Sequence, residues 1–442
     1  MGTFFLFYIR FEQKDRPLYS SITEADGMGE KPWDTIVIGG GASGLAAAVA
    51  AAEQGSRVLI LEKGPRIGRK ILASGNGRCN LMNDSAPRYY GDPGFAMRVL
   101  HRCGVPELTD FFHRYGLRLT RETEGRVYPM TLQAVSVLDT LKRALRLNRV
   151  QVRFDAAAER VATVAPDRGA GWLVSGKDIR ERASRVILAC GGPAQPKLGG
   201  TEDGGSLLQE LNHRVIPFQP ALTPIRTERQ AVSGLSGLRV RCDVSLLREG
   251  TVIHRESGEL LFTDYGVSGI CVMQCSRFVQ AGDLLEVNLL PRREDLPVSL
   301  EEELKTRRER FRDLPPETLL DGFLLPKVSY GVLKQAGIPL RGETAGEISD
   351  EQLHKILYAA AHYQLRITEI GGFDQAQVSA GGADCREFDP ETMESRLHPG
   401  LYATGELLNV DGDCGGFNLM FAFATGLIAG EACSSPSGFK LP

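Results

Sequence analysis

The chain has 442 residues, 42% of them hydrophobic and 24% charged, which allows two or three globular domains. Its 52 basic and 55 acidic residues give a net charge of −3, which excludes an overall positive field that would attract nucleic acid or an anionic membrane. No apolar run approaches the roughly 20 residues that span a bilayer, and nine cysteines without zinc-type spacing favour reduced thiols in a cytoplasmic protein without a metal site.

Residues 1–33 are predicted to be a variable N-terminal extension. The apolar patch Phe4–Ile9 lacks the basic segment and the small-residue cleavage site of a secretory signal. Met28 is a candidate alternative start, because the first predicted strand begins only at Asp34.

Residues 34–62 read as a strand, a glycine turn, an Ala-rich helix and a second strand, which predicts a dinucleotide-binding βαβ unit. Gly39 allows the tight turn, Gly41 lets backbone amides approach a pyrophosphate, and Gly44 lets the helix pack closely on the strand. Glu62 ends the second strand, where a carboxylate can accept hydrogen bonds from ribose hydroxyls and would repel a phosphate. The unit therefore favours FAD or NAD over NADP. Its predicted cofactor contacts are Gly39, Gly41, Ala42, Ser43, Gly44 and Glu62.

Residues 63–83 are too rich in Gly, Asn and cations for a core element and predict a second loop facing the cofactor. Small residues there let the backbone approach a flat ring, and the cations can offset diphosphate or flavin negative charge. Cys79 is interpreted as a small residue fitted beside the ring in preference to a redox thiol. The predicted contacts are Lys63, Arg69, Lys70, Ser74, Gly75, Gly77, Arg78 and Cys79.

Three stretches carry a resemblance to a known family: GGGASG at 39–44, EKGPRIGRKILASGNGRCN at 62–80, and GLYATGELLNVDGDCGGFNLMFAFATG at 400–426. They resemble a bacterial family of FAD-dependent oxidoreductases that includes aminoacetone oxidase and a dehydro-bile-acid reductase. The resemblance implies an α/β fold with a glutathione-reductase-like FAD-binding Rossmann domain. This domain is expected to be discontinuous, at 34–214 and 368–433, with an inserted β-rich and helical domain at 215–367 and a C-terminal tail at 434–442.

Residues 93–214 are expected to complete the first half of the FAD domain. Helical apolar spacing over 93–150 is broken at 125–129, a break that would return the chain to the cofactor edge and makes Tyr128 a pocket candidate. Residues 185–192 read as a buried parallel strand that ends in glycines. In the wider FAD class such a strand brings its backbone near the cofactor, and a glycine loop at 199–205 follows. The predicted contacts are Ala189, Gly191, Gly192 and Asp203.

The inserted domain shows alternating strand patterns followed by helices. The charge run at 300–312 interleaves acids and bases, which favours a solvated helix over an RNA-binding face. A capping box at 349–352 predicts the start of a helix that runs towards His362. The segment 258–269 is either a structural turn or part of the substrate pocket, with Asp264, Tyr265 and Ser268 as the pocket candidates.

The C-terminal part repeats the theme of a strand followed by an acid. In FAD enzymes of the resembling class, the acid at the position of Glu406 contacts a ribityl hydroxyl. The glycine turn at 411–418 leads into a helix of small residues, whose positive N-terminus can stabilise the anionic reduced flavin. The predicted contacts are Gly405, Glu406, Gly415, Gly416, Phe417 and Asn418.

These patterns predict an enzyme that transfers a hydride through flavin N5. Only one dinucleotide fingerprint is visible, so an NAD(P)H donor would have to bind another surface. The first hypothesis is reduction of an activated C=C bond in a small steroid-like or enone-like molecule. The alternatives are oxidation of a small amine by oxygen, and a flavin-bound RNA-binding or redox-sensing protein without turnover. No nucleic-acid or membrane partner is expected, and no oligomeric state is indicated.

Overall fold

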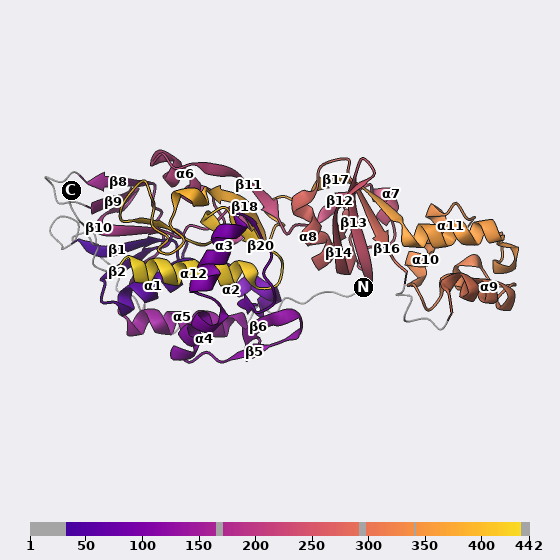
Figure 1. The fold of residues 1–442 in the computed structure, drawn as a ribbon, viewed down its shortest axis with the longest axis horizontal. Helices are drawn as coiled ribbons and strands as arrows, with labels where there is room; N and C mark the ends of the chain where they lie inside the picture. Colours follow the sequence, from indigo (N-terminus) through magenta and orange to yellow (C-terminus); the bar gives the residue numbers. More distant parts are fainter. Residues whose placement is uncertain (1–31, 165–170, 291–297, 340–341, 435–442) are drawn as a thin grey trace.

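The structure is a computed structural model that describes residues 32–164, 171–290, 298–339 and 342–434. The predicted extension before residue 32 and the tail after residue 434 lie outside these ranges. Three units follow one another along the long axis of the molecule: a sheet unit formed by both ends of the chain, a β-barrel and a helical unit (Figure 1). Within the described ranges, no helix is long and apolar enough to cross a bilayer.

The central sheet of the sheet unit has seven strands. β1 (Trp33–Ile38) lies between β2 (Val58–Leu61) and β10 (Ile179–Leu188) and is parallel to both. β7 (Gln151–Arg153) extends the sheet beyond β2, and β19 (Leu401–Ala403) pairs in parallel with the end of β10. The antiparallel strands β8 (Arg160–Val164) and β9 (Gly171–Gly176) complete it. Because parallel strands end at the same edge of a sheet, the segments that follow β1, β10 and β19 meet there.

Two parallel helices bring the ends of the chain together. α1 (Ala42–Glu53) follows β1, and α12 (Phe417–Ala432) lies against it. A Cβ atom at Gly426 would lie 2.3 Å from the carbonyl oxygen of Ser43, and one at Gly430 would lie 2.3 Å from that of Ala47. The two backbones therefore touch, and with a rise of about 1.5 Å per residue the N-terminus of α12 lies about 12 Å beyond that of α1.

The remaining elements of the sheet unit surround this core. Its other helices are α2 (Arg69–Ala73), α3 (Pro93–Arg102), α4 (Val105–Arg114), α5 (Ala134–Leu147) and α6 (Asp203–Glu210). A small antiparallel sheet contains β3 (Met82–Asn83), β6 (Arg126–Pro129) and β5 (Leu119–Arg121), and β4 (Tyr89–Gly91) pairs with β20 (Val410–Gly412). The break in the helical pattern at 125–129 is thus β6, which runs beside the second predicted loop.

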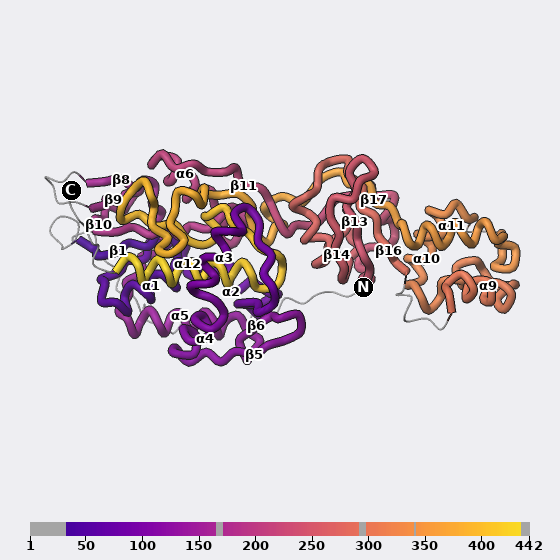
Figure 2. The backbone as a smooth tube through the Cα atoms, viewed as in Figure 1, coloured from indigo at the N-terminus to yellow at the C-terminus, as the bar shows by residue number. Residues whose placement is uncertain are grey.

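Two antiparallel strands connect the sheet unit to the barrel. β11 (Val215–Ala221) leads out and β18 (Val378–Ala383) leads back, and the two are paired (Figure 2). At the far end of this pair, the amide of Gly371 donates to the carbonyl of Pro224 at 2.8 Å. The chain therefore leaves and returns at almost the same point.

Six antiparallel strands form a closed barrel in the order β12, β15, β14, β13, β16, β17. Alternate residues of β13, including Cys242, Val244 and Leu246, fill its interior, as the period of two requires. The strands are β12 (Ile225–Thr227), β13 (Arg239–Arg248), β14 (Thr251–Phe262), β15 (Gly266–Ser268), β16 (Leu284–Asn288) and β17 (Tyr363–Ile370), with helices α7 (Arg229–Val232) and α8 (Ile270–Cys275).

The helical unit lies between β16 and β17 and contains α9 (Leu300–Arg310), α10 (Pro326–Gln335) and α11 (Asp350–Ala361). The predicted capping box is present, because Ser349 accepts from the amide of Gln352 at the start of α11. The charge run forms α9, but two of its arginines hold the unit together instead of facing solvent freely. Arg307 binds Glu303 at 2.9 Å and lies over Phe323, while Arg308 binds Asp350 at 2.6 Å.

Candidate functional site

Three of the four glycines in residues 39–44, at the turn from β1 into α1, are each required for a different physical reason. Gly39 has φ +110°, and a Cβ atom there would lie 2.4 Å from the carbonyl oxygen of Ala189 at the end of β10. A Cβ atom at Gly44 would lie 2.0 Å from the carbonyl oxygen of Gly39, so Gly44 allows helix and turn to touch. At Gly41 a Cβ atom would meet nothing within 4 Å in the part of the chain that the structure describes, its chain neighbours aside. The N-terminus of α1, which includes Ala42 and Ser43, therefore faces open space beside Gly41.

Glu62 lies at the end of β2 and is held against this turn. One carboxylate oxygen accepts from the amide of Gly40 at 2.8 Å, and the other accepts from the amide of Gly64 at 2.8 Å. Each oxygen can accept a further hydrogen bond. The carboxylate is thus fixed in orientation and still able to bind ribose hydroxyls.

A second cluster joins four segments that are distant in sequence. Lys70 Nζ lies 3.1 Å from Glu406 Oε2 and donates to the carbonyl of Gly192 at 3.3 Å. The amide of Ser379 donates to Glu406 Oε1 at 2.8 Å. The structure therefore brings together predicted residues from the second loop, the end of β10 and the segment after β19.

The second loop contains several residues in left-handed backbone conformations, among them Gly75 at φ +55° and Gly77 at φ +82°. Arg78 lies over the ring of Tyr128, 4.5 Å from its centroid, and also pairs with Glu122 at 2.5 Å. Cys79 is fully buried, and burial raises the pKa of its thiol to about 12. A thiol with such a pKa stays protonated near neutral pH and is a poor nucleophile.

The glycine loop, defined here as residues 411–416, ends at the N-terminus of α12. Asn83 donates to the carbonyl of Gly415 at 2.8 Å. A Cβ atom at Gly416, which has φ +105°, would lie 2.5 Å from the carbonyl oxygen of Met82 and 2.7 Å from Asn80 Oδ1. This loop therefore approaches the second loop so closely that only glycine fits.

Asn80 is a candidate cofactor contact that sequence reasoning missed. It is only 8% exposed, and its side-chain oxygen has no hydrogen-bond partner among the residues that the structure describes. A buried polar oxygen without a partner is costly unless a ligand or water satisfies it. Together with the open space at Gly41 and the glycine cradle at Gly416, this orphaned oxygen fits a bound FAD. The signal available in the sequence was its place at the end of the Gly-Arg-Cys-Asn run.

Two predicted contacts at the start of α12 direct their side chains into the protein. Phe417 packs edge-on against Tyr89 with centroids 6.0 Å apart, and its carbonyl accepts from the Tyr89 hydroxyl at 2.8 Å. The Asn418 side chain bonds both the amide and the carbonyl of Gly412 at 2.8 Å. Both residues therefore shape the glycine loop, and their backbone amides remain at the helix N-terminus.

The other predicted contacts lie around this edge of the sheet. Lys63 pairs with Asp203 at 3.3 Å, Arg69 donates to the carbonyl of Lys197, and Ser74 donates to the carbonyl of Ile71 at 2.7 Å. The amide of Gly405 donates to the Thr425 hydroxyl at 2.9 Å.

The three pocket candidates of the barrel are held by the barrel itself. Tyr265 lies under Arg226, 5.3 Å from its guanidinium carbon, and Asp264 is exposed to solvent in the same turn. Ser268 ends β15, which pairs with β14. Met273 of α8 and Cys414 of the glycine loop both pack against a small apolar cluster between the sheet unit and the barrel.

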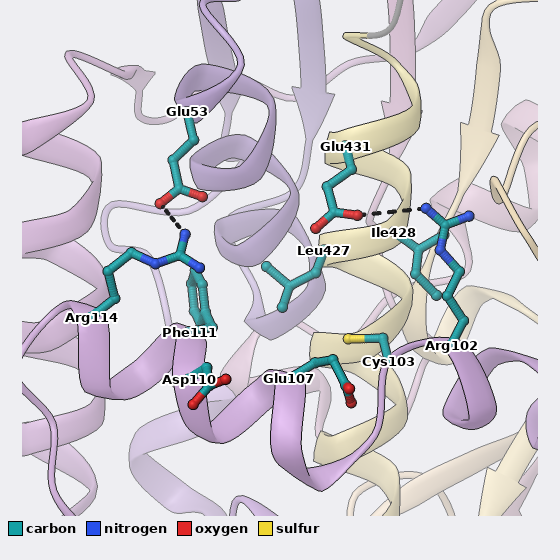
Figure 3. A pocket seen from close by; sticks show the side chains of 10 residues that line it. All are labelled: Glu53, Arg102, Cys103, Glu107, Asp110, Phe111, Arg114, Leu427, Ile428 and Glu431. Atoms are coloured by element: carbon teal, nitrogen blue, oxygen red, sulfur yellow. Dashed lines mark hydrogen bonds and ion pairs between the residues drawn. The ribbon is translucent and has the colours of Figure 1, made fainter.

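One pocket of about 250 Å³ lies away from these residues (Figure 3). It is found at the C-terminal ends of α1 and α12, and Figure 3 shows the ion pairs Glu53–Arg114 and Arg102–Glu431 across it. The described residues contain no group of three or more His, Cys, Asp or Glu side chains that could hold a metal ion.

Comparison with known proteins agrees with this arrangement. A family model described as HI0933-like protein Rossmann domain matches residues 33–432. The chain is 37% identical over 406 residues to the 3-dehydro-bile acid delta(4,6)-reductase of Clostridium scindens. The aligned region covers 90% of this chain and 98% of that protein. It is also 29% identical over 401 residues to the ribosomal RNA dihydrouridine synthase of Escherichia coli, covering 89% of this chain and 96% of that protein. The predicted family and the predicted Rossmann-type FAD fold are confirmed: the chain belongs to the HI0933-like family and is an FAD-dependent oxidoreductase.

Proposed function

We propose that this enzyme reduces a C=C bond conjugated to a carbonyl group in a small, steroid-like or enone-like molecule, with NAD(P)H as the electron donor. The observation that carries the proposal is the 37% identity to a delta(4,6)-reductase over 90% of the chain, a span that includes the barrel and the helical unit as well as the sheet unit. When bound, FAD supplies the hydride transfer through its N5 atom.

The chain's own residues have separable roles in this proposal. The N-terminus of α1 beside Gly41 binds the pyrophosphate, and Glu62 binds a ribose. Lys70 and Glu406 hold the ribityl region, and the N-terminus of α12 stabilises negative charge on the ring. These positions are supported by the open space at Gly41 and by the short contacts at Gly416.

Partly exposed apolar side chains between the sheet unit and the barrel support a substrate without charge at its reacting end. Ala221, Leu222 and Val378 form a buried cluster, and Met273 and Cys414 pack against it. Met273 and Cys414 are partly exposed at the glycine loop and therefore suit contact with a hydrocarbon ring system.

A second candidate substrate is a uridine in RNA. The Escherichia coli relative and a Haemophilus influenzae relative, 27% identical over 397 residues, both have the name ribosomal RNA dihydrouridine synthase. Reduction of uridine to dihydrouridine also saturates a C=C bond conjugated to a carbonyl, so the two candidates share one chemistry. The charge run of α9 favours the small molecule, because Arg307 and Arg308 are engaged inside the helical unit.

Anaerobic spectroscopy of the purified enzyme tests the proposal. We expect NADH or NADPH to bleach the flavin absorbance, and a 3-keto-4,6-diene steroid to restore it with loss of the conjugated chromophore. If a uridine-containing ribosomal RNA fragment restores the flavin absorbance and the steroid does not, the substrate is the second candidate, a uridine in RNA. Bleaching by aminoacetone, followed by formation of peroxide when oxygen is admitted, would instead identify an amine oxidase. No bleaching under any condition would contradict both reductase candidates.

A further inference from the structure

A buried ion pair links the barrel side of the molecule to the glycine loop. Arg277, which follows α8, binds both carboxylate oxygens of Asp411, and the Nη2–Oδ1 distance is 2.9 Å. The Asp411 side chain is 2% exposed and that of Arg277 is 15% exposed. Charges so far from water interact strongly, and removal of either partner leaves the other one buried without compensation.

Tyr90 fixes the geometry of this pair. β4 and β20 are antiparallel, and Tyr90 is the register partner of Asp411. The guanidinium of Arg277 lies 3.8 Å from the centroid of the Tyr90 ring, and the Tyr90 hydroxyl donates to Asp413 Oδ1 at 2.9 Å. Arg277 is therefore held by a carboxylate on one side and by an aromatic face on another.

A second arginine completes the contact between the units. Arg88 binds Asp413 at 2.5 Å and Glu256 of β14 at 3.1 Å. Glu256 also accepts from Gln274 at 2.8 Å and lies 2.8 Å from His254. Two arginines thus neutralise three buried carboxylates, those of Asp411, Asp413 and Glu256. Loss of either arginine would leave at least one of these charges without a partner arginine.

The position of Asp411 in the chain connects this pair to the cofactor. Asp411 begins the glycine loop, and α12 begins at Phe417. Burial raises the pKa of the Asp411 carboxyl, Arg277 opposes that rise, and the charge of Glu406 adds to it. Asp411 is therefore electrostatically coupled to Glu406, which belongs to the candidate flavin site.

We propose that Arg277 is a positioning residue that acts through Asp411: by neutralising this carboxylate, the barrel side of the molecule sets the electrostatic environment at the N-terminus of α12. An uncompensated carboxylate there would disfavour the negative charge that the ring gains on reduction. The inference rests on FAD binding by the family and is independent of the proposed substrate.

The test is the midpoint potential of the bound flavin, measured by reductive titration of the full-length holoenzyme without organic substrate. We expect Arg277→Gln to shift the potential to a more negative value, and Arg277→Lys, which keeps the charge, to stay near the wild-type value. The double variant Arg277→Gln/Asp411→Asn should return towards wild type, because the unpaired carboxylate is gone. Arg239→Gln is the matched control, since Arg239 forms an exposed pair with Glu259 on the barrel surface.

Each result decides for or against the inference. An unchanged potential in Arg277→Gln, or a double variant that keeps the shifted potential, would overturn it. If Arg277→Gln does not fold, Asp411→Asn alone must shift the potential to a more positive value, and an unchanged potential in that variant would also overturn the inference. Because no organic substrate is used, a failure of enone reduction leaves this test unaffected.

Discussion

Gly41 and Gly44 lie three residues apart, yet we expect substitution of Gly41 to affect only cofactor binding and substitution of Gly44 to affect folding too. A Cβ atom at Gly41 would meet no atom of another described residue within 4 Å apart from its chain neighbours, whereas one at Gly44 would lie 2.0 Å from a backbone oxygen. We expect Gly41→Ala to fold normally and to bind FAD about tenfold or more weakly, a loss of about 1.4 kcal/mol. Gly44→Ala should lower the melting temperature of the apoprotein as well. Measurements of flavin content and of thermal melting for both variants check these two expectations. A normal flavin content in Gly41→Ala would show that the pyrophosphate does not bind at this turn.

His213 should make the protein sensitive to mild acid. Burial lowers the pKa of this imidazole below 6.5, although a hydrogen bond to Glu387 partly opposes the shift. Ser395 Oγ already accepts two backbone N–H groups and lies 2.9 Å from His213 Nε2, so its proton is directed at a neutral ring. As the pH falls below 6.5, the unfolded chain takes up a proton before the folded chain does, and stability is lost by at most about 1.4 kcal/mol per pH unit.

The measurement is the free energy of unfolding between pH 7.5 and pH 5 in urea. His213→Gln should be less stable at pH 7.5 and should show a shallower decline towards pH 5. His354→Gln is the control, because that side chain is 61% exposed. An identical pH slope in wild type and His213→Gln would contradict the assignment of a neutral buried imidazole.

At the scale of elements, the packing of α12 on α1 depends on small residues. A Cβ atom at Gly430 would lie 2.3 Å from the Ala47 oxygen and 2.7 Å from the Ala50 Cβ. Helix propensity favours Ala over Gly by about 1 kcal/mol, but forcing apart two packed backbones costs more, so we expect Gly430→Ala to lose about 1–3 kcal/mol overall.

Gly94→Ala in α3 is the matched control for this prediction. A Cβ atom there would lie 3.5 Å from a side-chain oxygen of Asp92, which is an ordinary contact, so this variant should gain stability. Urea unfolding of the two variants separates packing from propensity, and a stabilised Gly430→Ala would show that the helices are not in backbone contact.

At the scale of the whole molecule, the sheet unit and the barrel have separate cores. The buried apolar residues of the sheet unit form one cluster, and those of the barrel and the helical unit form another. Because Pro224 and Gly371 are joined by a hydrogen bond, a tight turn can replace residues 225–370. We expect the shortened protein to fold and retain FAD but to lose substrate reduction, because the proposed substrate site includes residues of the unit that is removed.

The flavin spectrum of the purified protein and an enone-reduction assay check this outcome, with the full-length chain as the control. A shortened protein that folds without flavin would mean that the barrel contributes directly to cofactor binding. One that still reduces an enone at the full rate would mean that the sheet unit alone forms the substrate pocket.

Local features of the chain could be predicted because they depend on neighbouring residues. The turn at Gly39 needs a positive φ, β2 and the second half of β1 are runs of buried apolar residues, and the capping box at Ser349 satisfies amides three residues away. The family resemblance supplied the division of the FAD fold between the two ends of the chain. The charge run of α9 was predicted as a helix, but not the inward role of Arg307 and Arg308.

The amino-acid sequence by itself determined the order of strand, turn and helix, the type of cofactor and the family. Only the tertiary structure decided which side chains meet: Lys70 with Glu406 across 336 residues, Asn80 with Gly416, and Arg277 with Asp411. The physical reason is that local periodicity reports the face of an element that is buried, whereas such contacts depend on the close packing of α1 against α12 and on the return of the chain through β18.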